Sequence, residues 1–375
     1  MVENKTNTKQ IVQPHMKSIA FLFPGFVFSP VGGFKVPLEY ANRLAEDGYE
    51  VHVVYADAIK YNHHVPFLLK WKLRLRAWMI NHGLRRRTIR AWFPLDNRIK
   101  EHVTYTLRYN EVPKTDISVC TAIDTSPFLQ SYPIDASRKF YFIQGYENWG
   151  RTDKEVKKTY HFAMEKIVIS SWLQQIVTVE EHEPCVIVKN GFDTKRFYLT
   201  VPIREKNKFQ VSMLYHLANI KDCQTSFKAL GIVKQKYPQI RVNIFGTPLR
   251  PVDLPDWYTY YQCPSQEEHL RINNESAIYV AASVDEGWGL TVGEAMLCGQ
   301  AVACTDNRGF REMAIDGETA LLSPVRDAQA LASNICRLIE DDNLRFRLAE
   351  NGMRYVGKMT LEHSYLEFKK ALNLS

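Results

Sequence analysis

Residues 18–55 read SIAFLFPGFVFSPVGGFKVPLEYANRLAEDGYEVHVVY and contain the first regular elements of the chain. Ser18–Phe23 is a short apolar run that suits a buried strand, and residues 50–55 form a second such run. Between them, a loop with Gly32 and Gly33 leads into apolar positions spaced as on one face of a helix. A strand, a helix and a strand in so short a segment form a βαβ unit, which implies a parallel sheet.

The same alternation continues along the chain and restarts after a polar, charged stretch at residues 200–208. Apolar runs predict further strands at residues 117–122, 139–143, 166–170, 185–188, 211–215, 242–245, 277–282 and 300–304. Helical patterns are expected at residues 225–236, 291–298 and 327–339. A chain of 375 residues is long enough for two domains with separate cores. We therefore expect two consecutive parallel α/β domains with a cleft between them.

Composition excludes several classes of protein. Hydrophobic residues make up 45% and charged residues 24% of the chain, as in ordinary globular proteins. No apolar run approaches the roughly 18 residues of a membrane span, and residues 1–17 lack the apolar core of a secretory signal. The seven cysteines include no Cys-x-x-Cys pair, which argues against a disulfide framework or a zinc site. We expect a cytoplasmic protein with reduced thiols.

Residues 285–299 read DEGWGLTVGEAMLCG and follow an apolar strand at the start of a helix. Gly287 and Gly289 allow the backbone to approach a ligand closely. The free N–H groups near Leu290 and Thr291, at the helix N-terminus, are suited to bind an anion. The segment therefore predicts a phosphate site that needs no metal.

Two glutamates flank this predicted phosphate site. Glu286 precedes the loop and Glu294 follows it by one helical turn, so both could accept hydrogen bonds from the hydroxyls of a sugar. Thr291-x-x-Glu294 also fits a capping box, in which Glu294 would satisfy backbone donors only. Taken alone, the segment leaves both interpretations open.

The whole segment resembles the E-x7-E signature of the family 4 retaining glycosyltransferases, which have the GT-B fold. Glu286 and Glu294 fall on the two glutamates of that signature. The resemblance extends over about residues 30–357, through the glycine loop near the N-terminus, Asn-Gly-Phe-Asp at 190–193 and Gly-Phe-Arg-Glu at 309–312.

The resemblance implies a GT-B fold, an α/β architecture of two Rossmann-like parallel-sheet domains that face each other across a cleft. Residues 1–203 would form the acceptor-binding domain, with residues 68–100 as a basic insertion. Residues 204–358 would bind the nucleotide sugar. Residues 359–375 would form a helix that packs back on the first domain.

The resemblance also implies roles for individual residues on the donor side. Glu294 would bind the nucleotide ribose and Glu286 the hydroxyls of the donor sugar. The amides of Gly289, Leu290 and Thr291 would hold the diphosphate, and we count Trp288 of the same loop among the donor-binding residues.

A lysine and two glycines would complete the donor site. Lys221 would stabilise the leaving nucleoside diphosphate. Gly32 and Gly33 would pass close to the diphosphate from the opposite domain. Without the motif, Lys221 would be interpreted as a solvated loop cation and the two glycines as an ordinary turn.

Three positions depart from the family pattern. Tyr215-His216 stands where the family has Gly-Arg, so we expect diphosphate binding to be weaker or pH-dependent. Asp222 replaces the glycine after the lysine. Gln144 stands where many members have a histidine and cannot act as a conventional acid or base, although we count it with Glu286 and Lys221 as catalytic. A similar Gln-x-Tyr-Glu occurs in a subset that makes bacterial surface glycans, including rhamnosyl and mannosyl transferases.

The implied function is retaining transfer of a sugar from a nucleotide-diphosphate donor to a hydroxyl of a glycan or lipid-linked acceptor, in polysaccharide synthesis. No cofactor or metal is expected, because no Asp-x-Asp occurs and the lysine and helix N-terminus would replace a divalent cation. A non-catalytic GT-B subunit that stabilises a partner transferase is the alternative. A dinucleotide-dependent oxidoreductase is disfavoured by the absence of Gly-x-Gly-x-x-Gly after the first strand.

Residues 68–100 carry most of the excess positive charge of a protein whose net charge is +7. This stretch holds ten basic residues against Asp96 alone, includes three consecutive arginines at 85–87, and mixes them with tryptophans. Cations beside tryptophans suit an anionic membrane surface. A nucleic-acid surface and a solvated basic face are the alternatives. We favour peripheral contact with the inner face of the plasma membrane, since a lipid-linked acceptor would explain the stretch, and we expect no nucleic acid as partner.

Overall fold

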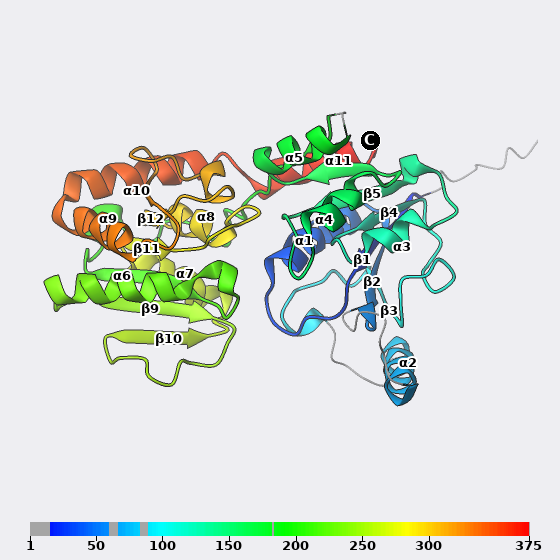
Figure 1. The fold of residues 1–375 in the computed structure, drawn as a ribbon, viewed down its shortest axis with the longest axis horizontal. Helices are drawn as coiled ribbons and strands as arrows, with labels where there is room; N and C mark the ends of the chain where they lie inside the picture. The colour runs from blue at the N-terminus through cyan, green and yellow to red at the C-terminus, as the bar shows by residue number, and fades with distance from the viewer. Residues whose placement is uncertain (1–15, 60–66, 83–88, 182–183, 375) are drawn as a thin grey trace, which may run out of the picture.

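The computed structural model describes residues 16–59, 67–82, 89–181 and 184–374. The three arginines at 85–87 lie outside the described residues. Two parallel sheets, one in each half of the chain, lie side by side, with helices packed around each (Figure 1).

The first sheet has seven strands in the order β3-β2-β1-β4-β5-β6-β7, and all neighbouring strands are parallel. Its strands are β1 (Ser18–Phe23), β2 (Glu50–Ala56), β3 (Lys100–Thr104), β4 (Ile117–Cys120), β5 (Lys139–Ile143), β6 (Glu165–Val168) and β7 (Val186–Ile187). The α-helices of this half are α1 (Gly32–Glu46), α2 (Phe67–Asn81), α3 (Ser126–Gln130), α4 (Asp153–Tyr160) and α5 (Ser171–Glu181). The central strands β1, β4 and β5 are almost completely buried, which agrees with their continuous apolar sequences.

The second sheet has six parallel strands in the order β10-β9-β8-β11-β12-β13. Its strands are β8 (Gln210–Tyr215), β9 (Arg241–Gly246), β10 (Tyr258–Gln262), β11 (Ile278–Ala281), β12 (Ala301–Thr305) and β13 (Ala320–Ser323). The α-helices that follow β7 in the chain are α6 (Cys223–Lys236), α7 (Gln266–Glu275), α8 (Leu290–Leu297), α9 (Ala328–Glu340), α10 (Asp342–Val356) and α11 (Leu361–Ala371).

The last helix, α11, packs on the first half of the chain. The Tyr40 hydroxyl on α1 lies 2.5 Å from Ser364 Oγ on α11, and the Tyr40 ring stacks on Phe368 with centroids 4.4 Å apart. The chain returns to the first half beside its outgoing segment, where Phe192 and Thr360 form a parallel β-bridge. The chain therefore crosses between the two halves twice, in two adjacent segments.

The expected fold class, two parallel-sheet α/β units, is confirmed, and the predicted strands and helices are all present with ends shifted by a few residues. The sequence patterns missed β3, β10 and β13, and they left the basic stretch ambiguous between strand and helix. In the structure its first part is the helix α2.

Candidate active site

The glycine-rich segment forms the loop between β11 and α8, as its sequence predicts. Gly289 caps α8 with φ of 107°, and a Cβ atom there would lie 2.7 Å from the Phe310 ring. Only glycine meets both conditions without strain. No side chain caps α8, so the first amides of the helix, at Leu290 and Thr291, are not used by a cap. They are available to an anion, as the sequence analysis expects.

Glu294 bonds to the first half of the chain, so the capping-box interpretation does not hold. Its side chain is buried on α8, and Oε1 accepts a hydrogen bond from Lys35 Nζ of α1 at 2.9 Å. Lys35 was missed by the sequence analysis. Its position two residues after Gly33, in the first turn of α1, was the available signal.

Glu286 and Lys221 form an ion pair at the other end of the loop. Lys221 Nζ lies 2.6 Å from Glu286 Oε1, which also accepts a hydrogen bond of 2.7 Å from Ser283 Oγ. A small pocket beside the pair is lined by Lys221, Glu286 and Thr291 among others. The structure therefore brings together three of the residues predicted for donor binding.

Lys221 is held by a turn that Asp222 stabilises. Lys221 ends the short 3₁₀ segment η5 (Asn219–Lys221), and Asp222 follows in a left-handed conformation with φ of 39°. The Asp222 carboxylate caps α6 by accepting from the Thr225 amide at 3.4 Å and from its hydroxyl at 2.7 Å. The aspartate in place of the usual glycine thus supports the turn that carries the lysine.

His216 lies near the same lysine. Burial lowers the pKa of His216, and the Lys221 cation lowers it further. Its Nδ1 accepts a hydrogen bond from the Ala218 amide at 2.9 Å, which assigns the hydrogen of the neutral ring to Nε2. His216 is therefore a neutral donor near pH 7 rather than a cation.

This geometry leads to a prediction for the pH dependence of donor binding. The resemblance implies a nucleotide-sugar diphosphate beside His216, to which the neutral ring would donate a hydrogen bond. Affinity for such a donor is then expected to stay constant between about pH 6.5 and pH 8. His216→Ala should weaken binding about fivefold across that range, the value of one neutral hydrogen bond. Calorimetry with the intact nucleotide sugar measures this, since its diphosphate does not titrate there. A steep gain in wild-type affinity below pH 7, absent in the variant, would mean that imidazolium is the binding form.

The residues predicted from the first half contact the loop of the second half. An added Cβ on Gly32 would lie 3.4 Å from Leu290 Cδ1, and one on Gly287 would lie 2.0 Å from the Gln144 carbonyl oxygen. Gln144 Nε2 donates to the carbonyl oxygens of Gly33 at 2.8 Å and Thr121 at 3.2 Å. The two glycines begin α1 rather than lie in a loop before it, so Gln144 ties the first turn of α1 to the first sheet.

Trp288 lies in the core rather than at the surface of the loop. It is 2% exposed, and its indole nitrogen has no hydrogen-bond partner within the described part of the chain. Its neighbours on both sides, Gly287 and Gly289, make the close approaches of the loop instead.

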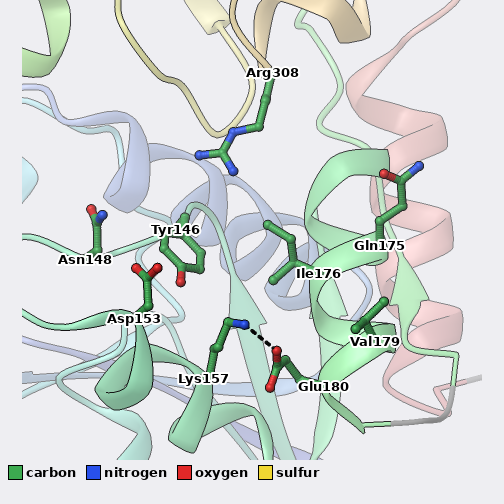
Figure 2. Close-up of a pocket in the computed structure, with 9 residues that line it drawn as sticks. All are labelled: Tyr146, Asn148, Asp153, Lys157, Gln175, Ile176, Val179, Glu180 and Arg308. Carbon is green, nitrogen blue, oxygen red and sulfur yellow. Dashed lines mark ion pairs between the residues drawn. The ribbon is translucent and has the colours of Figure 1, made fainter.

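An open groove lies beside the loop that follows β5 (Figure 2). Its first lining residue in the sequence is Tyr146, two residues after Gln144. Its volume is about 570 Å³, and it lies between the loop after β5, the helices α4 and α5, and a loop of the second half. The groove is lined by Tyr146, Asn148, Asp153, Lys157, Gln175, Ile176, Val179, Glu180 and Arg308. Trp149, in the same β5 loop, is 65% exposed. This mixture of donors, acceptors and aromatic rings suits a ligand with many hydroxyl groups.

Two charged groups of the groove are held by ion pairs. Lys157 Nζ lies 2.6 Å from Glu180 Oε1, as Figure 2 shows. Arg308 pairs with Asp285, one residue before Glu286, and its guanidinium lies 4.1 Å from the centroid of the Trp172 ring. Arg308 therefore connects the groove to the loop that carries Glu286.

Residues 200–355 match the family model described as Glycosyl transferases group 1. EpsD of Bacillus subtilis, whose name assigns it to the glycosyltransferases, is 29% identical over 184 residues, which cover 44% of this chain and 48% of EpsD. The N,N'-diacetylbacillosaminyl-diphospho-undecaprenol alpha-1,3-N-acetylgalactosaminyltransferase of Campylobacter jejuni is 23% identical over 239 residues, 58% of this chain and 63% of that protein. This chain thus spans about half the length of the curated relatives it matches.

Solved structures resemble the whole chain. HepE of Anabaena, in complex with UDP-glucose, superposes with a TM-score of 0.70 over 95% of this chain and 99% of HepE, at 16% identity. At that identity the likeness shows the fold alone. The fold is GT-B, as the sequence predicts. The resemblance to glycosyltransferases of group 1 is confirmed for residues 200–355. Assignment to family 4 and to the rhamnosyl and mannosyl subset stays a prediction.

Proposed function

We propose that this protein is a retaining, metal-independent glycosyltransferase that uses a nucleotide-diphosphate sugar. The observation that carries the proposal is the Lys221–Glu286 ion pair, 2.6 Å long, beside the uncapped N-terminus of α8. A cation, open helix amides and a carboxylate match the leaving diphosphate and the sugar hydroxyls of such a donor. The match to glycosyltransferases group 1 and the fold shared with a UDP-glucose complex support this assignment.

In the proposed reaction, the acceptor oxygen forms a bond to the anomeric carbon while the bond from that carbon to the leaving phosphate breaks. The acceptor proton passes to an oxygen of the departing phosphate on the same face, so no protein nucleophile is required. Lys221 Nζ and the α8 amides would stabilise the charge that develops on the diphosphate, in place of a metal ion. Glu286 would accept from donor hydroxyls, and Glu294 would accept from the ribose.

We propose that the acceptor is a glycan or lipid-linked saccharide in surface polysaccharide synthesis. The open groove at the loop after β5 supports a saccharide, because its side chains are mostly hydrogen-bonding groups beside the Tyr146 ring. The Campylobacter relative, whose name specifies a diphospho-undecaprenol acceptor, supports a lipid-linked one. Among the described residues, none of the helices is long and apolar enough to cross a bilayer. We propose peripheral contact with the cytoplasmic face of the plasma membrane, where a lipid-linked acceptor would lie.

Binding of nucleotides to Glu294→Ala tests the proposed donor site. One of UDP, GDP, dTDP and ADP should raise the Tm of the wild type, with or without EDTA. The variant should bind that nucleotide about 10²-fold more weakly, because it loses charge-assisted hydrogen bonds to the ribose. Glu318→Ala, an exposed glutamate of the same half, is the matched control and should bind normally.

The alternative function, a non-catalytic GT-B subunit that stabilises a partner transferase, predicts a different result. If none of the four nucleotides stabilises the wild type, the site does not bind a donor and the protein is a GT-B subunit that supports a partner. If EDTA abolishes stabilisation, the proposed metal independence is wrong although the donor site stands.

A further inference from the structure

Helix α2 forms the first part of the basic stretch and lies outside the sheet. Figure 1 shows it beyond β3, the edge strand of the first sheet. Leu73 and Ala77 are buried on its inner face, where Leu73 packs with Ala58 and Tyr105 of the sheet edge. Arg76 adds an ion pair to Asp57, which is completely buried. One face of α2 is thus fixed on the protein.

The opposite face of α2 is also apolar, and it is exposed. Leu68, Trp71, Leu75 and Trp78 are 81%, 60%, 57% and 51% exposed. Their spacing of three, four and three residues places them in one stripe along the helix, turned away from Leu73. A helix that is apolar on two opposite faces is typical of an element covered on both sides.

The charges around the exposed stripe indicate what covers it. Lys72 and Arg74 are exposed on either side of the stripe, and the Arg74 guanidinium lies 5.1 Å from the centroid of the Tyr105 ring. Lys70 is exposed farther round the helix, and α2 contains no acidic residue. Tryptophan side chains prefer the headgroup level of a bilayer, and lysine and arginine next to them contact anionic headgroups. Two tryptophans and two leucines flanked by cations are complementary to an anionic bilayer rather than to a nucleic acid, which offers no apolar surface outside its stacked bases.

We propose that α2 lies flat on an anionic membrane, with Leu68, Trp71, Leu75 and Trp78 in the headgroup region. The order of the sheet then sets the orientation of the protein. β3 and β7 are the two edges of the first sheet, and the chain leaves for the second half after β7. Docking through α2 therefore places the bilayer at the edge away from the interdomain connection. Only the reason for such docking, a lipid-linked acceptor, rests on the proposed function.

Binding to vesicles tests the proposal directly. The full-length wild type should sediment with vesicles of phosphatidylglycerol and phosphatidylcholine, and much less with phosphatidylcholine alone. Trp71→Glu with Trp78→Glu should reduce binding at least about tenfold, and Lys70→Gln with Lys72→Gln about tenfold with a weaker dependence on salt. Leu249→Glu with Val252→Glu, two exposed apolar residues of the second half, is the matched control and should bind as the wild type does.

Tryptophan fluorescence distinguishes insertion of the α2 side chains into the bilayer from electrostatic attraction to its surface. Brominated lipids should quench wild-type tryptophan emission, while Trp71→Phe with Trp78→Phe should still bind vesicles and lose most of that quenching. Equal binding of the wild type and the glutamate variant would overturn the proposal. So would a wild-type dimer in light scattering that the glutamate variant converts to a monomer, because a second copy would then cover α2. Nucleotide binding should be the same in all these variants, so failure at the membrane is distinguishable from failure of the donor site.

Discussion

Lys221→Ala is expected to lower kcat for sugar transfer by about 10²–10³-fold, the usual loss when one group that stabilises developing charge is removed. Lys221 Nζ already lies 2.6 Å from Glu286, and a departing diphosphate would give it a second anionic partner. Its contribution should be larger in the transition state than in the ground state, since negative charge grows on the leaving group. Steady-state kinetics with the nucleotide sugar selected by thermal shift measures the effect.

Whether the Lys221→Ala substitution changes kcat or KM distinguishes a catalytic role of Lys221 from a role in donor binding alone. Loss of the lysine leaves Glu286 its hydrogen bond from Ser283, so the carboxylate keeps one of its two hydrogen-bond partners. Lys228→Ala, an exposed lysine on α6, should keep wild-type kinetics. A rise in KM for the Lys221 variant with kcat unchanged would mean that the lysine only binds the donor.

The central strands were predictable because parallel strands buried on both faces have continuous apolar sequences. The three strands that the sequence patterns missed, β3, β10 and β13, all lie at sheet edges. β3 and β10 are partly exposed, and their sequences KEHVT and YTYYQ mix polar with apolar residues. β13 is mostly buried, but its four residues, ALLS, are too few to form a clear pattern. Helix α2 was ambiguous for a related reason, since apolar residues on two opposite faces hide the helical period.

The residues of the donor loop were predictable because their chemistry is local. Gly289, the open amides of α8 and Glu286 lie within a few residues of one another. The bond from Lys35 to Glu294 was not predictable, because 259 residues separate them and only the packing of the two halves brings them together. Burial of Trp288 is likewise a consequence of tertiary packing, which a glycine-rich loop sequence does not report.

Glu147 is expected to make the stability of the protein depend on pH. It follows β5, and Oε2 accepts a hydrogen bond of 2.5 Å from the Ile123 amide. Burial raises the pKa of Glu147 from 4.5 to about 7, against the lowering effects of this amide and of Arg151, while the nearby Asp124 raises it further. Neutral Glu147 is therefore the form that the folded protein favours.

The direction of the effect follows from the two protonation states. Between about pH 4.5 and pH 7 the folded protein keeps a proton that the unfolded chain releases, so this group lowers the free energy of unfolding as the pH rises through that window. The full shift corresponds to about 3 kcal/mol. Glu147→Gln stays neutral and retains an oxygen for the Ile123 amide, so it should be more stable than the wild type at pH 8 by up to that amount and similar at pH 5.

Urea unfolding of both proteins at pH 5 and pH 8 gives the comparison, and the quantity of interest is the difference between their free energies of unfolding at each pH. Glu165→Gln, an exposed glutamate on β6, controls for removal of a negative charge from the same sheet and should show the same pH dependence as the wild type. If the advantage of Glu147→Gln is the same at both pH values, Glu147 does not titrate in this window. The carboxylate would then be ionised in the folded protein, stabilised by the Ile123 amide and by Arg151, which pairs with Asp124.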